Sequence, residues 1–131
     1  MEKEEILRKI VEVLKNEEKV AFAYLFGSFL FGKYFNDIDL AVYVVDEVDV
    51  NFEEKLALKL EKEIGMEFDV FIINDKPTLF LSEVFRKGKL IFSRDEELRV
   101  KFETFKLAEV LEYNELMKHF DERRFEKYEV G

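Results

Sequence analysis

Residues 20–45, VAFAYLFGSFLFGKYFNDIDLAVYVV, contain two apolar runs, with two aspartates at the start of the second. The first run, VAFAYLF over 20–26, ends at Gly27-Ser28, and its length and flanks predict a buried strand. The second run, DIDLAVYVV over 37–45, is rich in β-branched and aromatic residues and predicts another strand. A small sheet therefore forms the centre of the expected fold.

Helical periodicity appears on both sides of this stretch. Residues 2–16 place isoleucines at helical spacing among Glu and Lys, which predicts an amphipathic helix. After Asn51, apolar residues recur at every fourth position until Gly65, so Asn51 is expected to cap a second helix and Gly65 to end it. The short segment 28–35 has room for one or two further helical turns.

The remaining chain alternates strand and helix again. Residues 66–73 predict a third strand, Pro77 opens a short helix that ends near Lys87, and residues 89–92 predict a fourth strand.

Ser93 and Glu96 form a capping-box pattern before a long C-terminal helix that begins near Arg94. The expected class is α/β (α+β), with a small mixed β-sheet and flanking helices, in a single domain over residues 1–131.

The composition excludes several classes of function. The chain has no cysteine, so it forms neither a disulfide framework nor a thiolate metal site. It lacks a membrane-length apolar run and a signal-peptide pattern, so we expect a cytoplasmic protein. A formal net charge of -9 argues against direct binding of a polynucleotide, because neutralising phosphates needs clustered positive charge.

Three aspartates are the candidates for chemistry. Asp37 and Asp39 are two positions apart on a strand, so both carboxylates lie on one face while Ile38 points into the core. Asp69 interrupts the apolar strand FDVFII. The alternatives are strand-edge acids that prevent aggregation, and an Asp69 that faces solvent. If the three acids meet at one site, their repulsion calls for a hard cation such as Mg²⁺.

Gly27-Ser28 is the candidate for binding phosphate. A glycine allows the backbone to approach an anion closely, and the Ser28 hydroxyl adds a donor to the exposed N–H groups of a helix start. The alternative is an ordinary turn at the end of a strand.

Together these residues carry a family resemblance. GSFLFGKYFNDIDLAVYV, with FDVFII downstream, resembles the MNT-type minimal nucleotidyltransferases of the polymerase-β-like superfamily. The resemblance implies the nucleotidyltransferase fold, with Gly27 and Ser28 holding the triphosphate of ATP. It implies that Asp37 and Asp39 bind Mg²⁺, and that Asp69 joins the metal site and helps to deprotonate the attacking hydroxyl.

The sequence departs from typical members between Ser28 and Asp37. Only eight residues separate them, fewer than usual, and this spacer is apolar where many members carry an arginine. Lys33 is its one cation, so we expect Lys33 to be the residue of the spacer that binds the phosphates.

The resemblance also implies a partner. Short members of this family accompany HEPN-domain ribonuclease toxins, so the expected activity is antitoxin action by transfer of AMP to a toxin tyrosine. Two alternatives stand beside it: an antitoxin that binds without turnover, and an enzyme that modifies small molecules. The second needs a further substrate-binding region, which a homo-oligomer could build between subunits.

Overall fold

The computed structural model describes residues 2–27, 29 and 37–130, and of residues 121–130 it describes the backbone. The elements follow the predicted order, with bounds within a few residues of those expected. They are α1 (Lys3–Lys15), β1 (Val20–Phe26), β2 (Asp37–Val44), α3 (Phe52–Ile64), β3 (Glu67–Ile72), α4 (Thr78–Lys87), β4 (Lys89–Ser93) and α5 (Glu96–Val130). The helical turn predicted over 28–35 lies outside the described residues, except for the buried Phe29.

The strands form one four-stranded sheet in the order β3-β2-β1-β4. β1 is antiparallel to both β2 and β4, whereas β2 and β3 are parallel and are joined across the sheet by α3. The sheet is therefore mixed, as the sequence predicted. This order places the ends of β1, β2 and β3 that carry the candidate residues next to one another.

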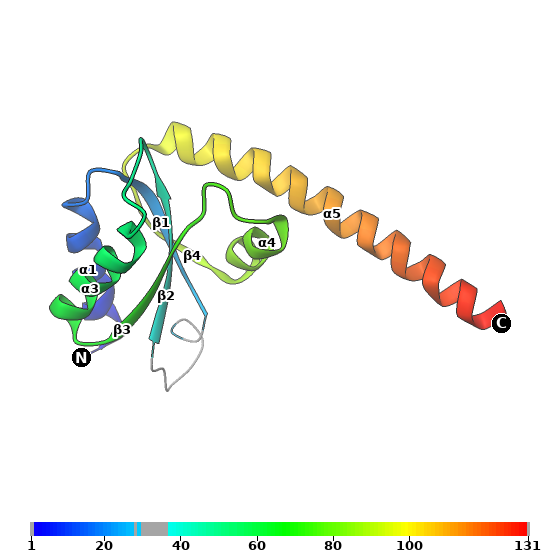
Figure 1. Ribbon diagram of the computed structural model, residues 1–131, viewed down its shortest axis with the longest axis horizontal. Helices are drawn as coiled ribbons and strands as arrows, with labels where there is room; N and C mark the ends of the chain where they lie inside the picture. Colours follow the sequence, from blue (N-terminus) through cyan, green and yellow to red (C-terminus); the bar gives the residue numbers. More distant parts are fainter. Residues whose placement is uncertain (1, 28, 30–36, 131) are drawn as a thin grey trace.

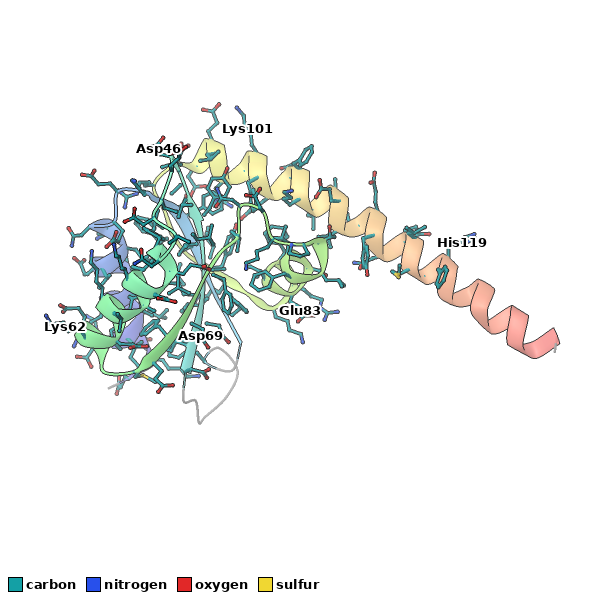
Figure 2. All side chains as sticks on the ribbon, viewed as in Figure 1. Asp46, Lys62, Asp69, Glu83, Lys101 and His119 are labelled. Atoms are coloured by element: carbon teal, nitrogen blue, oxygen red, sulfur yellow. The ribbon has the colours of Figure 1, made fainter. Side chains whose placement is uncertain are left out.

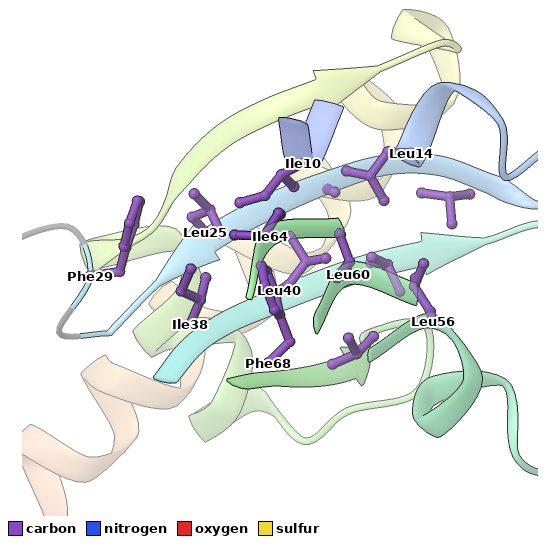
Figure 3. Packing of buried hydrophobic residues seen from close by; sticks show 14 of the residues in the cluster. Ile10, Leu14, Leu25, Phe29, Ile38, Leu40, Leu56, Leu60, Ile64 and Phe68 are labelled. Atoms are coloured by element: carbon purple, nitrogen blue, oxygen red, sulfur yellow. The ribbon is translucent and has the colours of Figure 1, made fainter. Parts of the chain in front are cut away.

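Helices cover both faces of the sheet. α1 and α3 lie on one face, and α4 with the first part of α5 lies on the other (Figure 1). The core under α1 and α3 is mainly aliphatic, with Ile10, Leu40 and Leu60 fully buried (Figure 3). The core under α4 and α5 is aromatic and includes Phe22 and Phe102. The two faces thus differ in chemistry as well as in the helices that cover them.

Two glutamates of α3 accept hydrogen bonds from the free edge of β3. The backbone N–H of Phe68 donates to Glu61 Oε1 at 3.2 Å, and that of Ile72 donates to Glu53 Oε2 at 3.0 Å. An unpaired strand edge is a template for aggregation, so these side chains cover it and fix α3 against β3. The same contacts hold Asp69, between the two bonded residues, in register with β2.

Two predicted helix caps differ from the structure. Asn51 occupies the N-cap position of α3, but its side chain makes no capping hydrogen bond. Ser93 and Glu96 do not form the capping box, because Ser93 belongs to β4 and α5 begins at Glu96. Asp95 caps that helix instead, accepting from the Leu98 N–H at 3.0 Å. Ser93 pairs with β1 as the last residue of β4, so it is not available to cap the helix.

Arg94, between β4 and α5, donates hydrogen bonds to backbone carbonyls near the N-terminal end of the fold. Its Nε donates to the Val20 carbonyl at 2.8 Å, and Nη2 donates to the Leu14 and Glu17 carbonyls at 2.8 and 3.1 Å. One guanidinium therefore ties the end of α1 and the start of β1 to the last strand.

α5 is much longer than the body it packs on, and its C-terminal half projects beyond it (Figure 1). Among the side chains that the structure describes, up to residue 120, Val110 is the last buried one along the helix, and Leu116 is 62% exposed. No helix among the residues that the structure describes is long and apolar enough to cross a membrane.

Candidate active site

The three predicted aspartates meet on the aromatic face of the sheet. Asp37 and Asp39 alternate with the fully buried Ile38 on β2, so both carboxylates emerge on the face opposite α1 and α3, as predicted. Parallel pairing sets Asp39 directly beside Asp69 on β3. One carboxylate oxygen from each residue lies within 4.8 Å of the others. The sequence predicted this set of residues, and the β2–β3 register brings it together.

Their surroundings differ. Asp37 and Asp39 are half-buried, whereas Asp69 is exposed at the end of the sheet (Figure 2). The alternative that Asp69 merely faces solvent is therefore half correct, because the carboxylate is exposed and also faces the other two acids. Asp69 is therefore the most accessible of the three carboxylates.

Burial and repulsion between the carboxylates raise the pKa of two of the three acids. Burial, and then the Asp37 and Asp69 carboxylates, raise the pKa of Asp39 above its ordinary value. Burial, and then a hydrogen bond and repulsion from Asp37, raise the pKa of Asp69. At separations near 5 Å, two carboxylates repel by about 1–3 kcal/mol at effective dielectric constants of 80 to 20. A divalent cation with oxygen ligands would remove this cost, so the donor set fits Mg²⁺.

Gly27 lies directly against this cluster. It follows β1 with φ +83°, and Phe26 pairs with Asp39 across the two strands. A Cβ on Gly27 would lie 2.3 Å from Asp39 Oδ2, so any residue other than glycine would force this carboxylate to move. The predicted partners Ser28 and Lys33 lie outside the described residues.

Sequence reasoning missed an aromatic cluster beside the acids. The rings of Phe26, Phe71 and Phe80 contact one another, and the Lys76 ammonium lies over two of them. The alternation of Asp69 and Phe71 along β3 was the available signal for one ring. The other two come from β1 and α4, which only the folded chain brings near.

Most of the sequence matches a known family profile. The family profile described as "Polymerase beta, Nucleotidyltransferase" matches residues 8–97, which include all four sheet strands and the three aspartates. The chain belongs to this nucleotidyltransferase family.

One relative is the protein adenylyltransferase MntA of Shewanella oneidensis, strain MR-1. It is 32% identical over 95 residues, which cover 69% of this nucleotidyltransferase and 68% of the relative.

Solved structures share the fold. One chain of a toxin–antitoxin crystal structure with AMP-PNP matches with a TM-score of 0.73 at 23% identity, covering 91% of this chain and 98% of that one. A chain of the complex between the tri-AMPylated S. oneidensis HEPN toxin and its MNT antitoxin matches with a TM-score of 0.69 at 23% identity. That match covers 95% of this nucleotidyltransferase and 98% of the other chain.

Proposed function

We propose that this nucleotidyltransferase is a protein adenylyltransferase that transfers AMP from ATP to a tyrosine hydroxyl of a HEPN-domain ribonuclease, and so acts as its antitoxin. The observation that carries the proposal is the cluster of three carboxylates within 4.8 Å, set against a glycine with positive φ at the end of a buried strand. The relative named as a protein adenylyltransferase supports the same activity.

Each site residue has a proposed role. Asp37, Asp39 and Asp69 would hold Mg²⁺, while Gly27, Ser28 and Lys33 would bind the triphosphate. Bound Mg²⁺ would neutralise charge on the phosphate oxygens during an in-line displacement.

The proposed reaction balances as a simple substitution at phosphorus. The hydroxyl oxygen forms a bond to the α-phosphorus of ATP, and the anhydride bond to the β-phosphate breaks. Pyrophosphate leaves, and the hydroxyl proton passes to Asp69, the exposed carboxylate of the three.

The charge of the chain supports a basic protein partner. With a formal net charge of -9, it suits an RNA-binding ribonuclease and opposes a polynucleotide substrate. We infer that residues 1–131 act as one domain and that the pair works in the cytoplasm.

The decisive test is covalent labelling. The chain is incubated with its HEPN partner and ATP labelled on the α-phosphate, and the partner's mass is measured. We expect the mass of one AMP on each modified tyrosine, and no label with Asp37→Asn/Asp39→Asn. Asp46→Asn is a matched control, because Asp46 lies at the opposite end of β2, is exposed, and has the positive φ that asparagine also tolerates (Figure 2).

A binding-only antitoxin is the second candidate, and the short apolar spacer before Asp37 favours it. Calorimetric titration of ATP with Mg²⁺ separates the two. The enzyme binds ATP in a metal-dependent way that the double variant loses, whereas a degenerate site binds none and leaves the partner unlabelled.

A further inference from the structure

Three phenylalanines from three elements form a surface next to the carboxylates, which we call the aromatic step. Phe26 ends β1, Phe71 lies on β3 and Phe80 lies on α4. Their ring centroids are separated by 5.8 Å (Phe26–Phe71), 5.7 Å (Phe26–Phe80) and 5.3 Å (Phe71–Phe80). All three side chains are half-buried, so each keeps part of its surface open while it packs against the other two.

The register of the sheet sets the step beside the acids. Phe26 pairs with Asp39, and Phe71 follows Asp69 by two residues, so it shares the same face. Two residues along a strand span about 7 Å. An aromatic ring laid over Phe71 with its long axis along the strand therefore directs its far end at the Asp69 carboxylate.

Lys76 adds a positive charge to the same surface. Its Nζ lies 5.8 Å from the Phe71 centroid and 5.4 Å from the Phe80 centroid. Within the described part of the chain, no carboxylate lies within salt-bridge distance of this ammonium. A half-buried cation held over ring faces favours another π-face at its side.

The position of the step distinguishes the two aromatic groups that could occupy it. Phe26 and the neighbouring Gly27, which faces the proposed triphosphate site, lie beside Asp39. Phe71 and Phe80 extend the surface towards β3 and α4, on the side of the exposed Asp69. A nucleobase would belong on the side of the phosphates. A group that brings a hydroxyl to Asp69 belongs on the side of Phe71.

We propose that the aromatic step receives the ring of the acceptor residue, so that the enzyme selects tyrosine over serine and threonine. The inference rests on the proposed function and names the feature that chooses its substrate. Phe71 and Phe80 contact the acceptor ring in offset or edge-to-face geometry, and Lys76 contacts its face. The phenol oxygen then attacks the α-phosphorus, its proton passes to Asp69, and pyrophosphate leaves. The three step residues and Lys76 position the acceptor and take no part in bond making.

The test uses the full chain and compares two leucine variants of one helix. Phe80→Leu removes a ring of the step but keeps its apolar bulk. Phe85→Leu is the matched control, since Phe85 is a half-buried residue of α4 whose ring contacts Tyr24 and Phe102, away from the acids. Circular dichroism and thermal melting establish that both variants fold.

Steady-state AMP transfer is then measured with the HEPN partner, with N-acetyltyrosinamide and with N-acetylserinamide. Phe80→Leu should raise the KM for both tyrosine acceptors by roughly three- to tenfold relative to Phe85→Leu, because it removes one ring–ring contact. The KM for ATP should not change. Lys76→Gln should also raise the acceptor KM, and wild type should prefer the tyrosine derivative to the serine derivative.

Three outcomes overturn the inference while the proposed function stands. A raised KM for ATP would show that the rings hold the nucleobase. Equal effects of Phe80→Leu and Phe85→Leu would show a packing role alone. Equal use of tyrosine and serine derivatives by wild type would remove the selectivity. If wild type labels no acceptor at all, the proposed function fails and the acceptor site fails with it.

Discussion

A side-chain carbon on Gly27 would lie 2.3 Å from Oδ2 of Asp39, because the two residues face each other where β1 ends and β2 begins. The backbone at Gly27 also has φ +83°, which a residue with a Cβ adopts at a cost of about 1–2 kcal/mol. Glycine at this position therefore has two effects: it leaves room for the Asp39 carboxylate, and it allows the backbone of the turn.

Gly27→Ala should reduce AMP transfer far more than it reduces stability. The added methyl group forces the Asp39 carboxylate out of its place among the three acids. A displacement of about 1 Å at a reacting centre costs roughly 100-fold in rate. Transfer to the partner and urea unfolding measure the two effects separately.

Gly65→Ala is the control for this change. Gly65 ends α3 with φ +82°, yet nothing lies within 4 Å of where its Cβ would stand. It should lose about the same stability as Gly27→Ala and keep full transfer. Equal losses of activity in the two variants would mean that strain in the turn, and not the contact with Asp39, explains the result.

Asp39→Asn should stabilise the metal-free chain at neutral pH by about 1 kcal/mol, because it removes repulsion among carboxylates near 5 Å apart. Burial, with Asp37 and Asp69, raises the pKa of Asp39, so the folded chain holds this proton more tightly than the unfolded chain does. The stabilisation by protonation is complete below the ordinary carboxyl pKa and is lost as the pH rises through the raised value. The advantage of the variant should therefore shrink towards acid pH.

Urea unfolding in EDTA, from neutral to acid pH, measures the difference in stability between wild type and Asp39→Asn. Added Mg²⁺ supplies the complementary test. Mg²⁺ should stabilise wild type and leave the variant almost unchanged, because only binding to the folded state raises its stability. A large fall in metal-free stability on substitution would instead assign Asp39 a structural role.

Tyr24→Phe should weaken the attachment of α5 to the sheet. The buried Tyr24 hydroxyl donates to Glu103 Oε1 at 2.5 Å, and Glu103 also accepts from Arg99 at 2.7 Å. Losing a hydrogen bond to a charged group costs about 1.5–3 kcal/mol at neutral pH. Chemical unfolding measures this cost, with Tyr113→Phe as the control, because Tyr113 is a half-buried tyrosine farther along the same helix.

Tyr24 should also make the chain lose stability at alkaline pH. Burial, and then Glu103, raise the pKa of Tyr24 well above its ordinary value, while the unfolded side chain ionises near pH 10. The stability that this residue contributes is therefore present below about pH 10 and is lost as the pH rises further. Wild type should lose stability more steeply than Tyr24→Phe between about pH 9 and 11, and parallel curves would refute the coupling.

The sequence predicted the parts of this site that depend on short spacing. Two positions along a strand are enough to put Asp37 and Asp39 on one face, and an apolar run with a glycine at its end is enough to predict β1. The long-range pairing was beyond such reasoning. The parallel register that brings Asp69 beside Asp39 depends on how α3 packs, and only the family resemblance anticipated its outcome.

The misses have the same cause. Ser93 has a capping-box pattern, but pairing with Phe22 keeps it in β4 and leaves the cap to Asp95. The aromatic step joins residues from β1, β3 and α4, so no window of the sequence contains it. Where tertiary contacts compete with a local pattern, the local pattern predicts the wrong residue.

The outer half of α5 should be dispensable for folding. Ending the chain after Asn114 removes Leu116 and Met117, which are 62% and 36% exposed, and retains Val110, which packs against the body at 5% exposure. Single substitutions of exposed side chains usually change stability by less than about 0.5 kcal/mol, so we expect the loss of this projecting segment to lower the thermal midpoint less than the loss of a buried residue does. A chain ending after Glu109 is the matched control, because removing the buried Val110 should cost about 1.5–3 kcal/mol. If the chain that ends after Asn114 already has a much lower thermal midpoint than the full chain, the projecting helix stabilises the body through contacts with it, and its exposed face is part of the fold.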